Sequence, residues 1–166
     1  MNETELKELI RKTLADRNAS PAAVRPLSTV TLRLAKALAA AVEEEAARIG
    51  VNAVVAVSDA SGRPILVEAM DDAYIASYDV ALQKAFTVVS LKMSTITLKP
   101  LAQPGGPLYG IQFTNDSHIV IFGGGEPLTM NGAVIGGLGV SGGSEEQDTA
   151  LAAFGAKVFA ELLRRI

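Results

Sequence analysis

The sequence predicts a single α+β domain in which an antiparallel sheet of about five strands is covered by helices. Two hairpin patterns, over residues 51–70 and 126–141, imply antiparallel strands. Three long segments, residues 28–49, 71–93 and 144–166, space their apolar residues as helices do. The length of 166 residues fits one domain. The hydrophobic fraction of 49% is high for a lone small domain, so we expect a homo-oligomer.

The first helix is expected over residues 28–49, with Ser28 as its N-cap and Gly50 as its left-handed end. Residues 51–58 then form a strand, the turn Asp59–Gly62 follows, and a second strand covers 63–70. A second helix should start at Asp71 and Asp72 and run to about residue 93.

The second half of the domain begins with an irregular stretch over residues 94–116, which is rich in proline and glycine. A third strand is expected at 117–122. Strands at 126–131 and 133–141 form a hairpin at Asn131-Gly132, since Asn-Gly is a strong hairpin signal. Ser144 should cap the last helix, which has acidic residues in its first turn and Arg164 and Arg165 in its last.

Residues 1–16 precede this domain and are expected to form a short amphipathic helix. Asn2 and Glu5 have the spacing of a capping box. The apolar residues lie on one face: Leu6, Leu9, Ile10 and Leu14. A helix this short is marginal alone in water, so it needs a partner surface. Residues 17–27 read as a linker.

Composition excludes several classes of function. The chain has no cysteine, so it has no disulfide, thiolate metal site or thiol nucleophile. A single histidine argues against structural zinc, and no metal is expected. A net charge of -3 without a basic stripe argues against nucleic acid. No membrane-length apolar run or secretory signal is present, so we expect a cytoplasmic protein that does not bind membranes.

Glycine distribution is the strongest local signal, because twelve of the fifteen glycines lie between Gly105 and Gly143. One cluster is Gly123–Gly125, and another precedes the last helix at Gly142 and Gly143. Such glycines admit a ligand close to the backbone, and a helix start can hold an anion. Turns and close strand packing are the alternative explanation.

Three side chains are candidates for chemistry. Lys84 and Asp71 could form an acid–base pair acting on a small carboxylate or aldehyde metabolite. The alternative is a helix cap and a paired or solvated lysine. His118, the one histidine, could be an axial ligand to haem iron, or it is an ordinary polar residue of the third strand.

Five motifs occur in the order seen in one known family. They are Val55–Pro64, Met70–Ala73, Ala81–Thr87, Gly124–Leu128, and Gly136–Gly143 with the trailing Gln147-Asp148. Over residues 28–165 the chain resembles the GlcG/HbpS-like family, which is also the C-terminal domain of PduO-type cobalamin adenosyltransferases. Arg63 and Asp72 depart from the family pattern, which has His or Asn and Gly there.

The resemblance implies a profilin-like α+β fold, a homo-oligomer, and haem or corrinoid binding in some members. The adenosyltransferase activity belongs to a separate N-terminal domain with no counterpart in this sequence, so it is not expected here. The expected ligand cleft lies between the second helix and the two glycine clusters. Its residues are Lys84, Gly124, Gly125, Glu126, Pro127, Ser141, Gly142 and Gly143.

Residues 1–14 resemble the encapsulation peptides that carry enzymes into bacterial microcompartments, which implies a shell protein as partner. Packing on its own domain or on a sister subunit is the alternative. The expected function is an accessory protein, non-enzymatic or weakly enzymatic, that binds haem or a corrinoid inside a microcompartment. A metabolite enzyme using Lys84 and Asp71, or a structural cargo oligomer, remains open.

Overall fold

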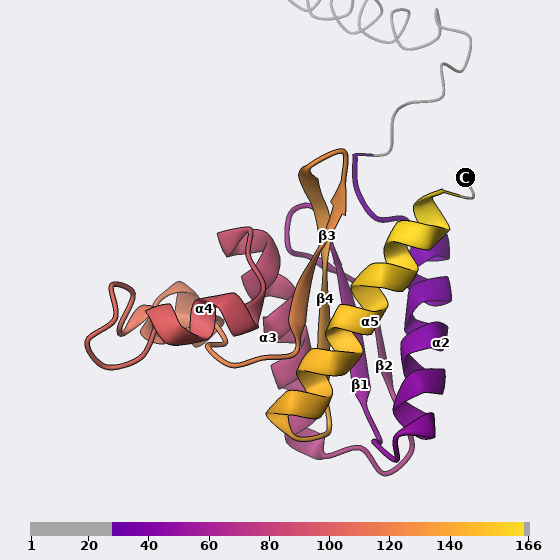
Figure 1. The fold of residues 1–166 in the computed structure, drawn as a ribbon, viewed down its shortest axis with the longest axis horizontal. Coiled ribbons are helices and arrows are strands. Elements are labelled where there is room, and N and C mark those ends of the chain that lie inside the picture. Colours follow the sequence, from indigo (N-terminus) through magenta and orange to yellow (C-terminus); the bar gives the residue numbers. More distant parts are fainter. Residues whose placement is uncertain (1–27, 165–166) are drawn as a thin grey trace, which may run out of the picture.

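The computed structural model describes residues 28–164, and they form three layers (Figure 1). A four-stranded antiparallel sheet lies in the middle, in the order β2-β1-β4-β3. Helices α2 and α5 cover one face of the sheet, and α3 covers the other. The predicted α+β class is confirmed. The helix and linker predicted for residues 1–27 lie outside the described residues.

Both predicted hairpins are present. Strand β1 (Val54–Asp59) pairs with β2 (Pro64–Ala69), and the Asp59 side chain accepts the N–H groups of Ser61 and Arg63 to fix the turn. Strand β3 (Gly125–Met130) pairs with β4 (Ala133–Ser141). Asn131 and Gly132 between them have φ of +51° and +79°, as a tight hairpin turn requires.

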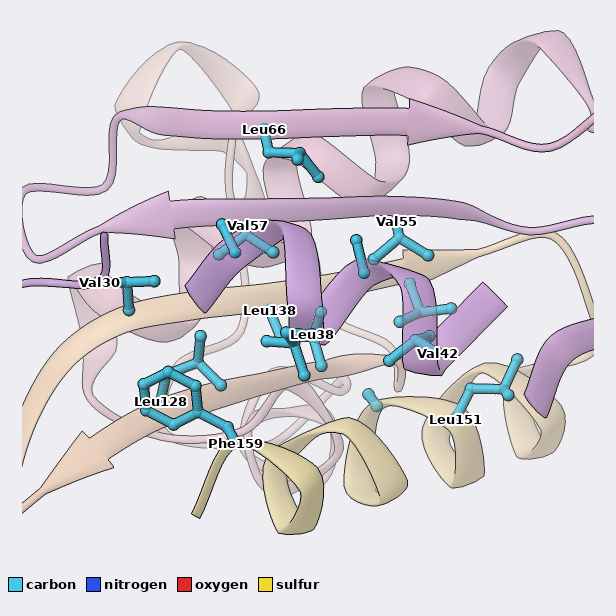
Figure 2. Close-up of a cluster of buried hydrophobic side chains, with 14 of the residues drawn as sticks. Val30, Leu38, Val42, Val55, Val57, Leu66, Leu128, Leu138, Leu151 and Phe159 are labelled. Carbon is cyan, nitrogen blue, oxygen red and sulfur yellow. The ribbon is translucent and has the colours of Figure 1, made fainter. Parts of the chain in front are cut away.

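The larger core lies between the sheet and the helices α2 (Leu32–Arg48) and α5 (Glu145–Leu163). Figure 2 shows Leu38 and Val42 of α2 beside Val55 and Val57 of the sheet, and it also labels Leu138, Leu151 and Phe159. Ser144 caps α5 in a capping box with Gln147, as expected. Thr31 caps α2, so the prediction of Ser28 as its cap was wrong.

Helix α3 (Ile75–Leu91) lies close to the opposite face of the sheet because the facing residues are small. Ala81 and Ala85 are buried against Val54 and Ala56 of β1. A β-carbon on Gly139 of β4 would collide with the Ala81 carbonyl oxygen. The helix begins four residues later than predicted, because Asp72 has a left-handed φ of +62° and lies in the preceding turn.

Residues 92–124 leave the layers and return, and Figure 1 shows this excursion projecting sideways from the sheet. It contains helix α4 (Thr95–Leu101) and short 3-10 turns at Ile111–Phe113 and Asn115–Ser117. The prediction of an irregular 94–116 therefore missed α4.

The strand predicted at 117–122 was also wrong, and the sheet has four strands in the described residues rather than about five. Asn115, Asp116 and Ser117 have φ of 50°, 54° and 61°, which turn the chain away from an extended path. The N–H of Val120 then donates to Thr87 Oγ1 at 3.0 Å. This segment is thus attached to α3 and not to the edge of the sheet.

Candidate functional site

Lys84 is a fully buried lysine on the sheet-facing side of α3, with 0% of its surface exposed. Its Nζ donates to the carbonyl oxygen of Val140 at 2.7 Å and to Asp148 Oδ2 at 2.9 Å. Val140 belongs to β4, and Asp148 lies in the first turn of α5. Because α3 and α5 cover opposite faces of the sheet, this one side chain connects all three layers.

The surroundings of the Lys84 ammonium group are closed on every described side. The ring of Phe122 lies 5.0 Å from Nζ, within cation–π range. Asp148 Oδ1 accepts the N–H of Gly143 at 2.9 Å, so both carboxylate oxygens are used. Burial lowers the pKa of Lys84, and the attraction of Asp148 opposes that shift. The group is a desolvated ion pair with protein partners.

The first glycine cluster packs around this ion pair. A β-carbon on Gly124 would lie 2.5 Å from Lys84 Nζ and 2.6 Å from the Val140 carbonyl oxygen. The N–H of Gly123 donates to Glu145 Oε1, and the N–H of Gly125 donates to Thr95 Oγ1. β-Carbons on Gly123 and Gly125 would collide with the side chains of Thr149 and Thr95, so close packing accounts for these three glycines.

Two carboxylates near the cluster have shifted pKa values in opposite directions. The Gly123 N–H, and then Lys99, hold the pKa of Glu145 below its ordinary value. Burial raises the pKa of Glu126, which follows Gly125 on β3 and precedes Pro127. Both residues are partly buried.

The second glycine cluster borders a separate polar pocket of about 470 Å³ at the start of α5. Two N–H groups at this helix start are already used, since Gly143 donates to Asp148 Oδ1 and Ser144 donates to Gln147 Oε1. Ser141 is buried, and its hydroxyl is hydrogen-bonded to that of Ser77. Asp72 lines the pocket as well, so its charge does not favour an anion. The lining residues are Gly50, Val51, Asn52, Asp72, Tyr74, Gly142, Gly143, Ser144 and Gln147.

Asp71 lies exposed in the turn before α3. No hydrogen bond or ion pair joins it to Lys84 in the described part of the chain, where Asp148 is the ionic partner of the lysine. The structure thus shows a different carboxylate beside Lys84 from the one that the sequence suggested.

His118 lies in a third environment, a mainly apolar pocket of about 230 Å³ between α3 and the turn that leads into β2. The imidazole meets the Phe86 ring edge-on, with 6.0 Å between ring centroids and an interplanar angle of 72°. The rest of the lining is Gly62, Pro64, Asp79, Leu82 and Gln83. The pocket combines the His118 imidazole with the apolar side chains of Leu82 and Phe86, and it also has a carboxylate and an amide in its lining.

An exposed apolar stripe on α3 extends from this pocket. Ile75 is 96% exposed and Tyr78 is 48% exposed, and they precede Leu82 and Phe86 at helical spacing. Ile75 is almost fully exposed at the start of the helix, whereas Phe86 is partly buried in the His118 pocket. A flat apolar molecule could lie along this face with His118 at one end.

Sequence reasoning missed the role of Asp148 and Phe122 as partners of Lys84. Asp148 was visible as the acid that trails the last glycine motif, but its pairing with a residue 64 positions earlier has no local signal. No cluster of three or more His, Cys, Asp or Glu suited to a metal ion occurs among residues 28–164. No helix in the same range is long and apolar enough to cross a membrane.

Comparison with known proteins identifies a matching family and similar proteins. The family model described as "Haem degrading protein HbpS-like" matches residues 30–157. An uncharacterized 15.0 kDa protein from the dhaT-dhaS intergenic region of Citrobacter freundii is 47% identical over 136 residues, covering 82% of this chain and 96% of that protein.

Two further relatives are named for corrinoid and haem chemistry. The corrinoid adenosyltransferase PduO of Salmonella typhimurium is 42% identical over 115 residues, which cover 69% of this chain but only 34% of PduO. The crystal structure of the PduOC:Heme complex superimposes with a TM-score of 0.75 at 37% identity, covering 78% of this chain and 94% of the other. The family match and the full-length relative together show that this chain belongs to the HbpS-like family.

Proposed function

We propose that this protein binds a tetrapyrrole, haem or a corrinoid, along the exposed side of α3 that borders the His118 pocket. The observation that carries the proposal is the position of the single histidine, which lines an apolar pocket that continues into an exposed apolar stripe. Membership of the HbpS-like family and the 37% identity to PduOC, which has been crystallised with haem, support it.

The residues present fit a haem group. Imidazole is a common axial ligand of haem iron, and Leu82 and Phe86 give the apolar wall that a macrocycle needs. The pocket of about 230 Å³ would take part of the macrocycle, and the exposed side chains of Tyr78 and Ile75 would extend the contact surface. Bound haem would supply the redox and ligand-exchange chemistry of its iron. The chain supplies the imidazole, the wall and the partial exclusion of water.

The test is a titration of the purified protein with haemin, followed by absorbance, with cobalamin in parallel. We expect a saturable shift of the Soret band, and His118→Ala should remove the shift or weaken binding at least tenfold. Asn52→Ala in the polar pocket at the start of α5 is the control and should bind as the unchanged protein does. No saturable change with either compound would rule out the proposal.

The same titration separates this site from the cleft predicted around the glycine clusters. Leu82→Asp places a charge in the wall of the His118 pocket and should weaken binding. A loss of binding with Asn52→Ala but not with His118→Ala would move the ligand to the pocket lined by Gly142 and Gly143. Lys84, which has no exposed surface, is expected to support the fold and not to touch the ligand.

We also propose that the protein is a homo-oligomer packaged in a bacterial microcompartment through residues 1–16. The similarity to PduO and the apolar stripe Leu6, Leu9, Ile10 and Leu14 support packaging. Exposed Tyr109 and Phe113 on the excursion after α4 support a subunit contact.

Fusing residues 1–16 to a fluorescent protein tests the targeting role. The fusion should co-purify with shell proteins, and Leu9→Gln with Ile10→Gln should abolish co-purification. If fluorescent protein without the fused segment co-purified with the shells in the same amount as the fusion, the targeting role would be contradicted. Light scattering of the full chain tests the oligomer, and a monomeric mass would contradict that part.

A further inference from the structure

One side of α5 carries an apolar groove that the functions proposed above do not use. The groove has a volume of about 560 Å³ and runs along the last turns of the helix. Its lining residues follow the 3–4 spacing of a seam between two helices: Phe154, Lys157, Val158, Glu161 and Leu162. Val158 and Leu162 reach the main core from their inner sides, whereas Lys157 and Glu161 are exposed at the rim.

We infer that the chain's own residues 2–14 dock as a helix in this groove. The segment is predicted to be amphipathic, and Leu6, Leu9, Ile10 and Leu14 repeat the 3–4 spacing of the α5 groove. A helix of this length is marginal alone and gains its stability from burying its apolar side. The groove offers an apolar seam of matching period within the same molecule.

The place where the chain enters the domain brings the segment to the groove. The Val30 N–H donates to the Ile135 carbonyl oxygen, and Val30 belongs to the same core cluster as Phe159 of α5. Figure 2 shows Val30 and Phe159 at the same end of the sheet. The entering chain therefore lies next to the half of α5 that carries the groove.

The tether is long enough. Residues 15–27 can span up to about 45 Å when extended. The groove extends from Phe154 to Leu162, which is only about 12 Å along a helix. The linker thus reaches either end of the groove, and the segment can bind in either direction.

Docking would change how the segment meets another partner. The inference rests on the targeting proposal only in that both use the same four apolar residues. A segment held on α5 hides them, so a shell protein would have to compete with the groove. Docking itself stands whether or not residues 1–16 target the protein.

The sequence offers a direct reporter, because the chain contains no tryptophan. Phe154→Trp places a single tryptophan in the groove of the full-length protein. If residues 2–14 cover it, Leu6→Gln with Ile10→Gln should shift its emission to the red and increase quenching by acrylamide. The matched control, Glu8→Gln with Arg11→Gln on the polar side, introduces the same two glutamines and should leave the emission unchanged.

A second reporter, Tyr78→Trp on α3, checks that any change is local, and its emission should not respond to either pair. An unchanged Phe154→Trp emission in the apolar pair would overturn the inference. So would equal shifts in both pairs or at both reporters. A mixing experiment tests whether another copy of the chain supplies the docked segment. The Phe154→Trp reporter with Leu6→Gln and Ile10→Gln is mixed with the full-length chain, which lacks tryptophan. Recovery of the blue emission would overturn docking by the chain's own segment.

The targeting experiment fails or succeeds independently. A red shift without co-purification of shell proteins would leave docking intact and remove targeting, and the reverse result would remove docking alone.

Discussion

Gly124 has no side chain, and this leaves the space through which Lys84 reaches Asp148. The backbone there has φ of +109°, and a β-carbon would lie 2.5 Å from Lys84 Nζ. Gly124→Ala should therefore lower the free energy of unfolding by about 3 kcal/mol or more, since the packed neighbours cannot move apart freely. Urea denaturation measures the loss.

Gly132→Ala is the control for this change. Gly132 also has a positive φ, +79°, but a β-carbon would meet nothing within 4 Å. It should cost only the left-handed penalty of about 1–2 kcal/mol. Equal losses at the two positions would show that the contact with Lys84 does not matter.

Glu126 is a second residue with a measurable consequence, because burial raises the pKa of its carboxyl above the ordinary 4.5. Between pH 4.5 and the raised pKa, Glu126 therefore binds a larger share of a proton in the folded protein than in the unfolded chain. The free energy of unfolding should fall as pH rises from 4.5 through the raised pKa, and stay lower above it. Glu126→Gln should remove this fall and stabilise the protein at pH 7. Thermal melts at pH 4 and pH 7, with Glu44→Gln on the exposed side of α2 as control, measure the difference.

At the scale of whole elements, helix α3 shows what the sequence could and could not predict. Its existence followed from the helical spacing of apolar residues. The spacing did not reveal which side is buried, because Ile75 and Tyr78 face solvent while Ala81 and Ala85 face the sheet. The glycines of β4 allow close contact only with the side of α3 that has small residues. Packing between distant elements therefore decides which side of α3 is buried.

The hairpins were predictable because their turns are local, and the four strands that they join are all present. The strand expected at 117–122 is absent because residues 115–117 are left-handed and because Thr87 of α3, 33 positions earlier, takes the N–H of Val120. The candidate site shows the same limit. Motifs pointed to Lys84 and the glycines, but the choice of Asp148 over Asp71 as partner depends on how α5 packs.

The left-handed turn at residues 115–117, before His118, allows a prediction for a whole element. Ser117 has φ of +61°, a conformation that costs a residue with a side chain about 1–2 kcal/mol. Ser117→Gly should relieve this cost, and the greater freedom of glycine in the unfolded chain offsets about 0.5–1 kcal/mol. We expect a net gain of about 0.5 kcal/mol in urea denaturation.

The same substitution in a regular helix should have the opposite sign. Ser90→Gly, on the exposed side of α3, should lose about 0.5 kcal/mol because glycine is a poor helix former. A loss at both positions would contradict the left-handed conformation of Ser117.

At the scale of the whole molecule, the Lys84–Asp148 pair connects layers that are otherwise separated by the sheet. The lysine leaves α3, passes Gly124 and ends between β4 and α5. Each charge is removed from water and is stabilised by the opposite charge of its partner. The arrangement of the layers at this end of the sheet should therefore fail if either partner is removed alone.

A double-mutant cycle tests this dependence. Lys84→Met keeps the length of the side chain but leaves the Asp148 carboxylate buried with only the Gly143 N–H, and it should cost about 3–5 kcal/mol. Asp148→Leu should cost a similar amount because it strands the buried ammonium group. Lys84→Met with Asp148→Leu removes both charges, so its loss should be smaller than the sum of the two single losses by 2 kcal/mol or more, roughly the size of couplings between contacting residues. Additive losses would mean that the two residues stabilise the protein independently, and that other contacts hold α5 to α3 across the end of the sheet.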